Sequence, residues 1–168
     1  VFSPHPDDAE GGCGGTMVRW AREGKDVILV TCTNGDKGTN DPNIKPADLV
    51  VTREAEQKAA AKILGVKELI RLAHPDQTLA EIPQFTEEIT RLIRTYRPEV
   101  VVTTDFQRRY RNHPDHRATG REVMDAVSLH ARNLYGYPDL YFNEGLELHI
   151  VNEVLFWGAE NPNVCSDI

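Results

Sequence analysis

Short β-branched runs alternate with longer helical stretches along almost the whole chain, and this alternation constrains the fold more than any other feature. Clear examples are the runs VILVTCT (27–33) and VVVTT (100–104), each followed by a stretch with helical patterning. Strands separated by helices are typical of a parallel sheet with helices on both faces. The sequence therefore predicts an α/β fold with a Rossmann-like, mostly parallel sheet, and an active site at the carboxyl ends of its strands.

The individual elements are expected from hydrophobic periodicity and from the glycine and proline residues that end helices. Strands are expected at Val1–Ser3, Val27–Thr33, Glu68–Leu72, Val100–Thr104 and Ile150–Trp157. Helices are expected at Gly14–Glu23, Ala47–Leu64, Ile82–Tyr96 and from Pro114 to about Leu134. Irregular segments are expected at Asn34–Pro46, Asp105–Asn112 and Tyr135–Gly145.

Length, charge and cysteine content limit the class of protein. A chain of 168 residues is expected to form a single domain, 1–168. A net charge of -7 argues against nucleic acid as a partner, because phosphate binding needs a basic surface. No apolar run reaches the length of a membrane span, no signal peptide is evident, and the three cysteines are dispersed, so a cytoplasmic protein with no membrane partner is expected. The ends lack an initiating methionine and a helix-ending signal, which predicts truncation at both ends.

Two four-residue motifs carry the chemistry expected of this chain. HPDD (5–8) follows the first expected strand, and HPDH (113–116) lies downstream of the strand VVVTT. In each motif the first and fourth side chains can be presented to one point, because residues three apart share a face where a helix begins. Two histidines and one carboxylate from two loops would supply the three ligands of a catalytic zinc site. A further carboxylate left off the metal, for which Asp7 is well placed, would act as general base on the bound water.

Two similar patterns are interpreted differently. A single His-Pro-Asp triplet is more often a turn than a site, and His74-Pro75-Asp76 lacks a ligand-type residue at its fourth position, so it is interpreted as not metal-binding. The glycines of GGCGG (11–15) do not complete a dinucleotide-binding pattern, because Met17 stands where a third glycine is required. These glycines are expected to let the first helix approach the loop closely.

Together the motifs resemble the PIG-L/LmbE family of zinc-dependent de-N-acetylases, which remove acetyl groups from N-acetylglucosamine-type conjugates. The resemblance is carried, in family order, by SPHPDDAE with GCGGT, TNGDKG (33–38), TREAE (52–56), PD within HPDQ, HPDHRA (113–118), and the late FWG with NPNVCSDI. The chain departs from the family at HPDQ (74–77), where the usual sequence is YPDG.

The resemblance implies a hydrolase of amide bonds that removes an acetyl group with a zinc-bound water activated by Asp7. Fe2+ or Mn2+ are alternative metals, the implied substrate is a small N-acetylated amino-sugar conjugate, and a homo-oligomer is a further inference from the family. His113 is implied to stabilise the tetrahedral oxyanion. The implied metal ligands are His5, Asp8 and His116, and the implied substrate contacts are Arg53 and Asp76.

The segment before HPDH is a local cationic patch in an acidic chain, with Arg108, Arg109 and Arg111 beside Phe106 and Tyr110. The patch can receive a carboxylate or phosphate of the substrate, or it can be a solvated loop or an ion-pair surface between subunits. Tyr110 is a candidate substrate-binding residue as a hydrogen-bond donor.

Two other functions stay open from the sequence. A phosphoesterase-like hydrolase could use the same metal, but such chemistry often needs two clamped metals, and the motifs supply one three-ligand set. A non-catalytic, metal-containing sugar-binding relative is the second alternative. The presence of both Asp7 and His113 argues against it.

Overall fold

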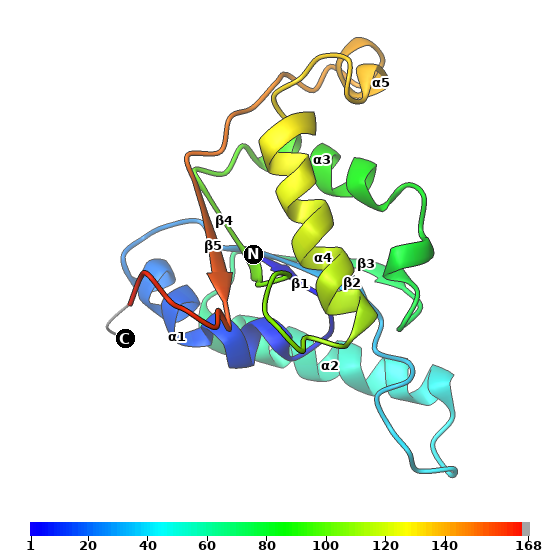
Figure 1. The fold of residues 1–168 in the computed structure, drawn as a ribbon. Coiled ribbons are helices and arrows are strands. Elements are labelled where there is room, and N and C mark those ends of the chain that lie inside the picture. The colour runs from blue at the N-terminus through cyan, green and yellow to red at the C-terminus, as the bar shows by residue number, and fades with distance from the viewer. Residues whose placement is uncertain (166–168) are drawn as a thin grey trace.

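The structure, a computed structural model, describes residues 1–165, so the end of the NPNVCSDI segment (166–168) lies outside the described residues. A layer of strands lies between two layers of helices (Figure 1). The strands are β1 (Phe2–Ser3), β2 (Ile28–Thr33), β3 (Glu68–His74), β4 (Val100–Thr104) and β5 (Glu153–Trp157). The helices are α1 (Asp8–Arg22), α2 (Pro46–Leu64), α3 (Phe85–Tyr96), α4 (Pro114–Asp125) and α5 (Pro138–Phe142), with a 3-10 turn at Leu79–Glu81 and a π-helical turn at Ala126–His130. None of the helices in this part of the chain is long and apolar enough to cross a membrane.

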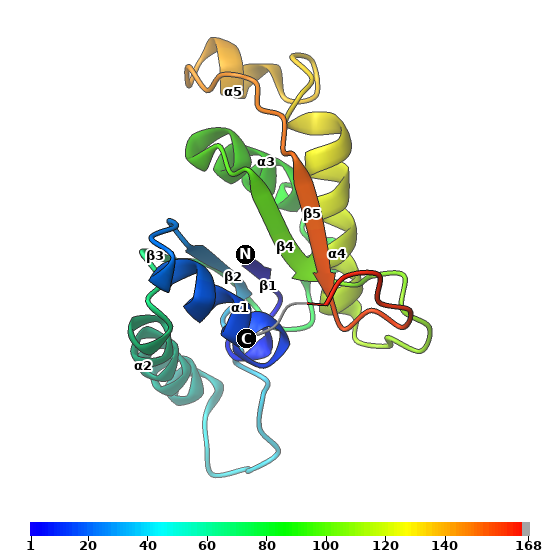
Figure 2. The same cartoon turned by 90° about the vertical axis from the view of Figure 1, so that its left-hand side faces the viewer.

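The strands pair in parallel, as the sequence predicts. β1 pairs with β2, β2 with β3, and β4 with β5. β4 lies beside β1 (Figure 2), where the Thr103 hydroxyl donates a hydrogen bond to the carbonyl oxygen of Phe2 at 3.1 Å. By backbone pairing, β1, β2 and β3 form one sheet and β4 and β5 form a second sheet. Because β1 and β4 are adjacent, the strands lie in the spatial order β3-β2-β1-β4-β5, and the chain extends this order in opposite directions on either side of β1 and β4. In open parallel sheets such a reversal leaves a crevice at the carboxyl ends of the two central strands.

Helices cover both faces of the sheet, which confirms the predicted architecture. α1 and α2 lie on one side and α3 and α4 on the other (Figure 2). Burial of the facing apolar side chains supplies the main driving force for this packing. The core on the first side includes Ala9, Met17, Val27 and Leu29. The larger core on the second side includes Phe2, Val30, Phe85, Ile89, Ile93, Val101 and Val123.

Several segments differ from the prediction. α3 begins at Phe85 rather than Ile82, and the helix expected from Pro114 to about Leu134 is α4, which ends at Asp125 and is followed by a π-helical turn to His130. The first helix begins at Asp8 rather than Gly14 and is kinked at Cys13, where φ is -147°. Glycines lower the intrinsic helix propensity of this segment, but complete burial of Ala9 and Met17 against the sheet stabilises the helix. A further difference is α5, which lies inside the segment Tyr135–Gly145 that was expected to be irregular.

Gly12 is required by close packing between α1 and β5. A Cβ atom at Gly12 would lie 2.4 Å from Cδ1 of Trp157, well inside van der Waals contact. A Cβ atom at the neighbouring Gly11 would have no other atom within 4 Å. The close approach that the sequence predicts for these glycines is thus made at Gly12, to a side chain of β5.

Gly12→Ala is expected to lower the free energy of unfolding by about 1–3 kcal/mol, because the added methyl group overpacks this contact. Gly11→Ala is the matched control on the same helix and is expected to raise the free energy of unfolding by about 0.5–1 kcal/mol, because alanine is the better helix former. Urea unfolding of the two variants measures both changes. Equal changes in the free energy of unfolding would show that helix propensity alone, and not the contact with Trp157, determines the effect of alanine at both positions.

Candidate metal centre

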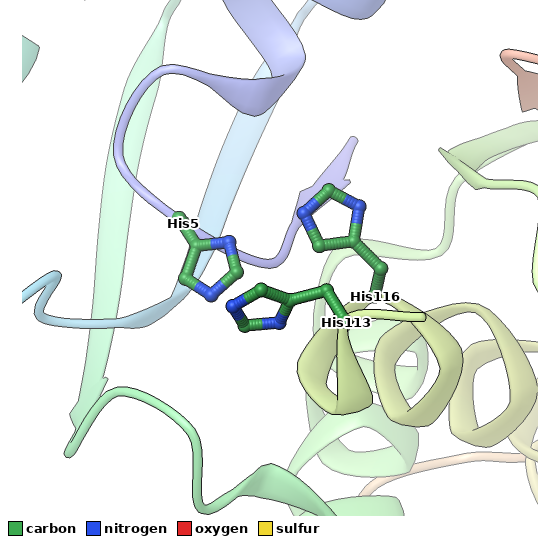
Figure 3. A group of neighbouring side chains, drawn as sticks. All are labelled: His5, His113 and His116. Carbon is green, nitrogen blue, oxygen red and sulfur yellow. The ribbon is translucent and has the colours of Figure 1, made fainter. Parts of the chain in front are cut away.

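The two histidine motifs meet at the carboxyl edge of the sheet, beside the reversal of strand order. His5 follows β1, while His113 immediately precedes α4 and His116 lies in its first turn. The three imidazole rings face one another (Figure 3). Their centroids are 4.6 Å apart for His5 and His113, 5.1 Å for His5 and His116, and 5.3 Å for His113 and His116. The sheet order thus brings together two motifs that lie far apart in the sequence.

Asp8 links two of these histidines through one oxygen atom. Its Oδ2 lies 2.8 Å from Nδ1 of His5 and 3.1 Å from Nε2 of His116. Burial disfavours the charged carboxylate, but the hydrogen bonds to His116 and His5 outweigh burial and hold the pKa of Asp8 well below its usual range. His5, Asp8 and His116 therefore form one cluster with an ionised carboxylate, and their assignment as metal ligands stays a prediction.

The other ring nitrogen of His5 faces two further carboxylates. Nε2 lies 3.2 Å from Oδ2 of Asp115 and 3.1 Å from Oδ1 of Asp76. Burial alone would lower the pKa of His5, but the hydrogen bonds to Asp115 and Asp8 outweigh burial and raise that pKa to about 10. A metal-binding His5 must be neutral, so binding of a cation at this ring would displace a proton.

The donor set fits a divalent cation. Nδ1 of His113 is buried and makes no hydrogen bond among the described residues. Oδ1 of Asp76 is also buried, and its 3.1 Å contact with Nε2 of His5 does not have the geometry of a hydrogen bond. Two overlapping groups place their ligand atoms within 4.8 Å of one another: His5, His113 and His116, and His5, Asp76, His113 and Asp115. Imidazole and carboxylate donors suit zinc, iron and manganese, so the cluster is consistent with a divalent metal of any of these kinds.

Asp115 is the residue of this site that sequence reasoning missed. It is fully buried and accepts hydrogen bonds from the backbone N–H groups of Gln77, at 2.6 Å, and Leu79, at 3.0 Å. A carboxylate on the far nitrogen of a metal-binding histidine commonly fixes the orientation of the ring. The available signal was its place between the two histidines of HPDH, an acidic residue just inside a helix that begins with Pro114.

Asp115→Asn is expected to weaken binding of zinc by about 10- to 100-fold, the usual cost of losing such an orienting partner. The carboxylate of Asp115 now accepts hydrogen bonds from the backbone N–H groups of Gln77 and Leu79. The amide of asparagine would place its NH2 group against one of these two donors. Asp125→Asn, at the exposed end of the same helix, is the control, and its 3.8 Å pair with Arg121 should contribute little. Competition with a chromogenic chelator measures both affinities, and equal affinities for both variants would rule out the orienting role.

Asp7 occupies a strained position next to the cluster. It is the N-cap residue of α1 with φ 123°, a backbone region that is costly for residues other than glycine. Its Oδ2 lies 3.4 Å from Nη1 of Arg53. Burial and the neighbouring charge of Asp8 raise the pKa of Asp7, which makes its carboxylate a better proton acceptor.

The surroundings of His113 favour the neutral form of its imidazole. Burial lowers the pKa of this histidine, and the positive charge on His5 lowers it further. Its side chain thus offers a neutral imidazole with one buried ring nitrogen that has no partner among residues 1–165.

The predicted substrate contacts lie in different surroundings. Arg53 lies beside Asp7, as described above. Asp76 is 5% exposed, and its backbone N–H donates to Oδ1 of Asp36 at 2.8 Å. Tyr110 is 91% exposed, with φ 59°, in the arginine-rich segment before His113. Their roles toward a substrate stay predictions.

The segment His74-Pro75-Asp76 was interpreted as not metal-binding, and this interpretation stays open for Asp76. His74 lies outside the cluster and pairs with Glu88 at 2.6 Å, but Asp76 belongs to one of the two groups that could hold a cation. Gln77, which stands in place of the family's glycine, has φ 67°, a left-handed conformation that favours glycine. The departure from the YPDG pattern therefore leaves the turn in place, with backbone strain at Gln77.

The fold and the cluster define a class of protein: a parallel α/β domain with a histidine and carboxylate site of metal-binding type at the crevice of its sheet. Residues 1–127 match the family described as GlcNAc-PI de-N-acetylase, PIG-L. The chain belongs to this family.

Two individual relatives support membership of this family. The chain is 36% identical, over 99% of its length, to the diacetylchitobiose deacetylase of Thermococcus kodakarensis, of which it covers 62%. Its structure matches the N,N'-diacetylchitobiose deacetylase of Pyrococcus horikoshii with a TM-score of 0.93 at 29% identity, covering 99% of this chain and 62% of that one. The chain thus spans less than two thirds of the length of these two relatives.

A second solved structure shows that the fold alone does not decide the reaction. GalB, a 4-carboxy-2-hydroxymuconate hydratase from Pseudomonas putida, matches with a TM-score of 0.72 at 20% identity, covering 92% of this chain and 62% of that one. A likeness at this level concerns the fold only.

Proposed function

We propose that the protein is a metal-dependent hydrolase that removes the acetyl group from an N-acetylglucosamine-type conjugate. The observation that carries the proposal is the convergence of His5, Asp8 and His116, with Asp7 adjacent to Asp8 in the chain. Membership of the family and the deacetylase activity named for two relatives support the same reaction. Zinc is the metal that we expect, and a homo-oligomer and a cytoplasmic location stay predictions.

Each residue has a separate role in this proposal. His5, Asp8 and His116 would hold the metal, and Asp115 would orient His5 from the far side of its ring. When bound, the metal supplies Lewis acidity and lowers the pKa of water. Asp7 would take a proton from the attacking water, since its raised pKa favours proton uptake.

His113 and Arg53 would act on the substrate and on the base. The His113 side chain would stabilise the negative charge that develops on the acetyl oxygen and assist departure of the amine. Arg53, 3.4 Å from Asp7, would hold that carboxylate in place and contact the sugar together with Asp76.

An acetate-release assay with N-acetylglucosamine conjugates tests the proposal. The protein is assayed as purified, after treatment with a chelator, and after addition of Zn2+, Fe2+ or Mn2+ to the chelated sample. We expect acetate release that chelation abolishes and one of the metals restores, with about one metal ion per chain from the three-ligand set. Release of phosphate from phosphoesters would favour the phosphoesterase alternative. Binding of the sugar without acetate release would favour the non-catalytic one.

A further inference from the structure

A second feature lies directly beside the candidate metal centre and is not used by the proposed reaction. It is an open pocket of about 520 Å³ whose lining consists of the consecutive residues 108–113 together with Glu160. His113 belongs both to this pocket and to the histidine cluster. A group that occupies the pocket would therefore lie next to a substrate bound at the centre.

Two of the arginines that line this pocket converge beside Gly158, which does not itself line it. A Cβ atom at Gly158 would lie 3.0 Å from Nη2 of Arg111 and 3.5 Å from Nη1 of Arg108. Both side chains therefore approach the same point over the end of β5, where glycine leaves space for them. Arg109 lies between them in the sequence and lines the same pocket. Like charges held this close repel one another unless an anion lies between them.

The carboxylate that lines this pocket does not balance its charge. Oε2 of Glu160 lies 3.9 Å from Nε of Arg109, and the two side chains are 46% and 79% exposed. An exposed ion pair at this distance contributes little. Three arginines thus face one weakly paired carboxylate, in a chain whose net charge is -7.

The backbone of this segment is fixed at both ends. At its start, the N–H of Asp105 donates to the carbonyl oxygen of Trp157 at 3.1 Å. At its end, Nη1 of Arg117 donates to the carbonyl oxygens of Arg111, at 3.1 Å, and Asn112, at 2.6 Å. Because these contacts hold the backbone, less ordering entropy is lost when a ligand binds the arginine side chains.

We propose that this arginine pocket binds an anionic group, a carboxylate or a phosphate, carried by the substrate. The inference rests on the proposed function and narrows its substrate class to N-acetylated amino sugars that bear such a group. Arginine forms paired, charge-assisted hydrogen bonds to the planar oxygens of both groups. Nη1 of Arg111 contacts Nδ1 of His116 at 2.9 Å, so the pocket adjoins the metal centre through one side chain.

Binding and turnover are compared for three probes: N-acetylglucosamine, its 6-phosphate, and N-acetylmuramic acid, which carries a carboxylate. Isothermal titration of the zinc-loaded chain measures binding, and acetate release measures kcat/KM. We expect at least one anionic sugar to bind and react about 10- to 100-fold better than the neutral one, the gain from hydrogen bonds between charged groups. This preference should fall as salt is added, because the pocket is open to solvent.

The Arg108→Met, Arg109→Met double variant tests whether these arginines bind the anionic group of the substrate. We expect it to reduce the ratio of anionic to neutral kcat/KM, and the ratio of the two affinities, by about 10- to 100-fold. Arg111 is left intact because it contacts His116. The Arg121→Met, Arg132→Met double variant, which removes two exposed arginines outside the pocket, is the charge-matched control and should leave both ratios unchanged.

The outcomes separate this inference from the proposed function. If none of the sugars releases acetate, the proposed reaction is wrong for these substrates, while the titrations still decide whether the pocket binds an anion. If acetate is released with equal kcat/KM from neutral and anionic sugars, and the double variant leaves the ratios unchanged, the anion pocket is wrong and the hydrolase assignment stands. A preference for one anionic sugar identifies phosphate or carboxylate as the bound group.

Discussion

Asp7→Asn is expected to lower kcat for acetate release by about 100- to 10,000-fold while leaving the bound metal in place. The loss corresponds to removing a general base, because an amide cannot accept the proton of the attacking water. The metal should stay because the cluster around His5 is made by Asp8, Asp76 and Asp115 rather than by Asp7. Asparagine is the better first substitution, since it tolerates positive φ, and Asp7 has φ 123°. Asp7→Ala is expected to have the same effect on kcat.

Metal content by atomic spectroscopy and steady-state kinetics decide this prediction together. Asp26→Asn serves as the control, because that carboxylate is 69% exposed and pairs with Lys67 away from the histidine cluster. Near-normal turnover by Asp7→Asn would remove Asp7 from the reaction. Loss of the metal from the same variant would instead make Asp7 part of the metal site.

His116→Gln and His113→Gln are expected to separate metal binding from catalysis within one four-residue motif. His116→Gln should lose both metal and activity, with a fall in metal affinity larger than the roughly 10- to 100-fold expected for Asp115→Asn, because it removes a ligand rather than an orienting partner. His113→Gln should retain the metal and lose about 100- to 1,000-fold in kcat, the usual cost of removing one oxyanion-stabilising group.

The two variants form a matched pair, since the same substitution is made three residues apart at the start of α4. Metal retained after dialysis and kcat are measured for both. If His113→Gln also loses its metal, the group of His5, His113 and His116 would be the better description of the ligand set. If His116→Gln retains it, the predicted triad is wrong.

Most of the fold could be predicted because its signals are local. β4 was predicted at Val100–Thr104 and lies there, since a β-branched run between turn residues is evident in the sequence. α2 was predicted to within one residue because Gly65 ends it in a left-handed conformation that glycine adopts without strain. The start of α1 was missed because burial of Ala9 and Met17, which depends on the sheet, overrides the low helix propensity of its glycines.

The candidate site was predictable only in part, because some of its contacts depend on the tertiary structure. The two histidine motifs could be recognised from residue type and spacing, and the structure brings His5, Asp8 and His116 into one cluster. The role of Asp115 was missed, because its place within HPDH does not show that its carboxylate contacts His5, 110 positions away. The convergence of Arg108 and Arg111 over Gly158 likewise depends on where β5 ends.

The sequence by itself determined the kinds of side chain available to the site and the strands and helices that carry them. Both follow from residue chemistry and from periodicities that span a few residues. The tertiary structure decided which carboxylate faces each nitrogen of His5, because those contacts exist only once the order β3-β2-β1-β4-β5 places the ends of β1 and β4 side by side. It also decided that the arginines of the segment before His113 line a pocket next to the same centre.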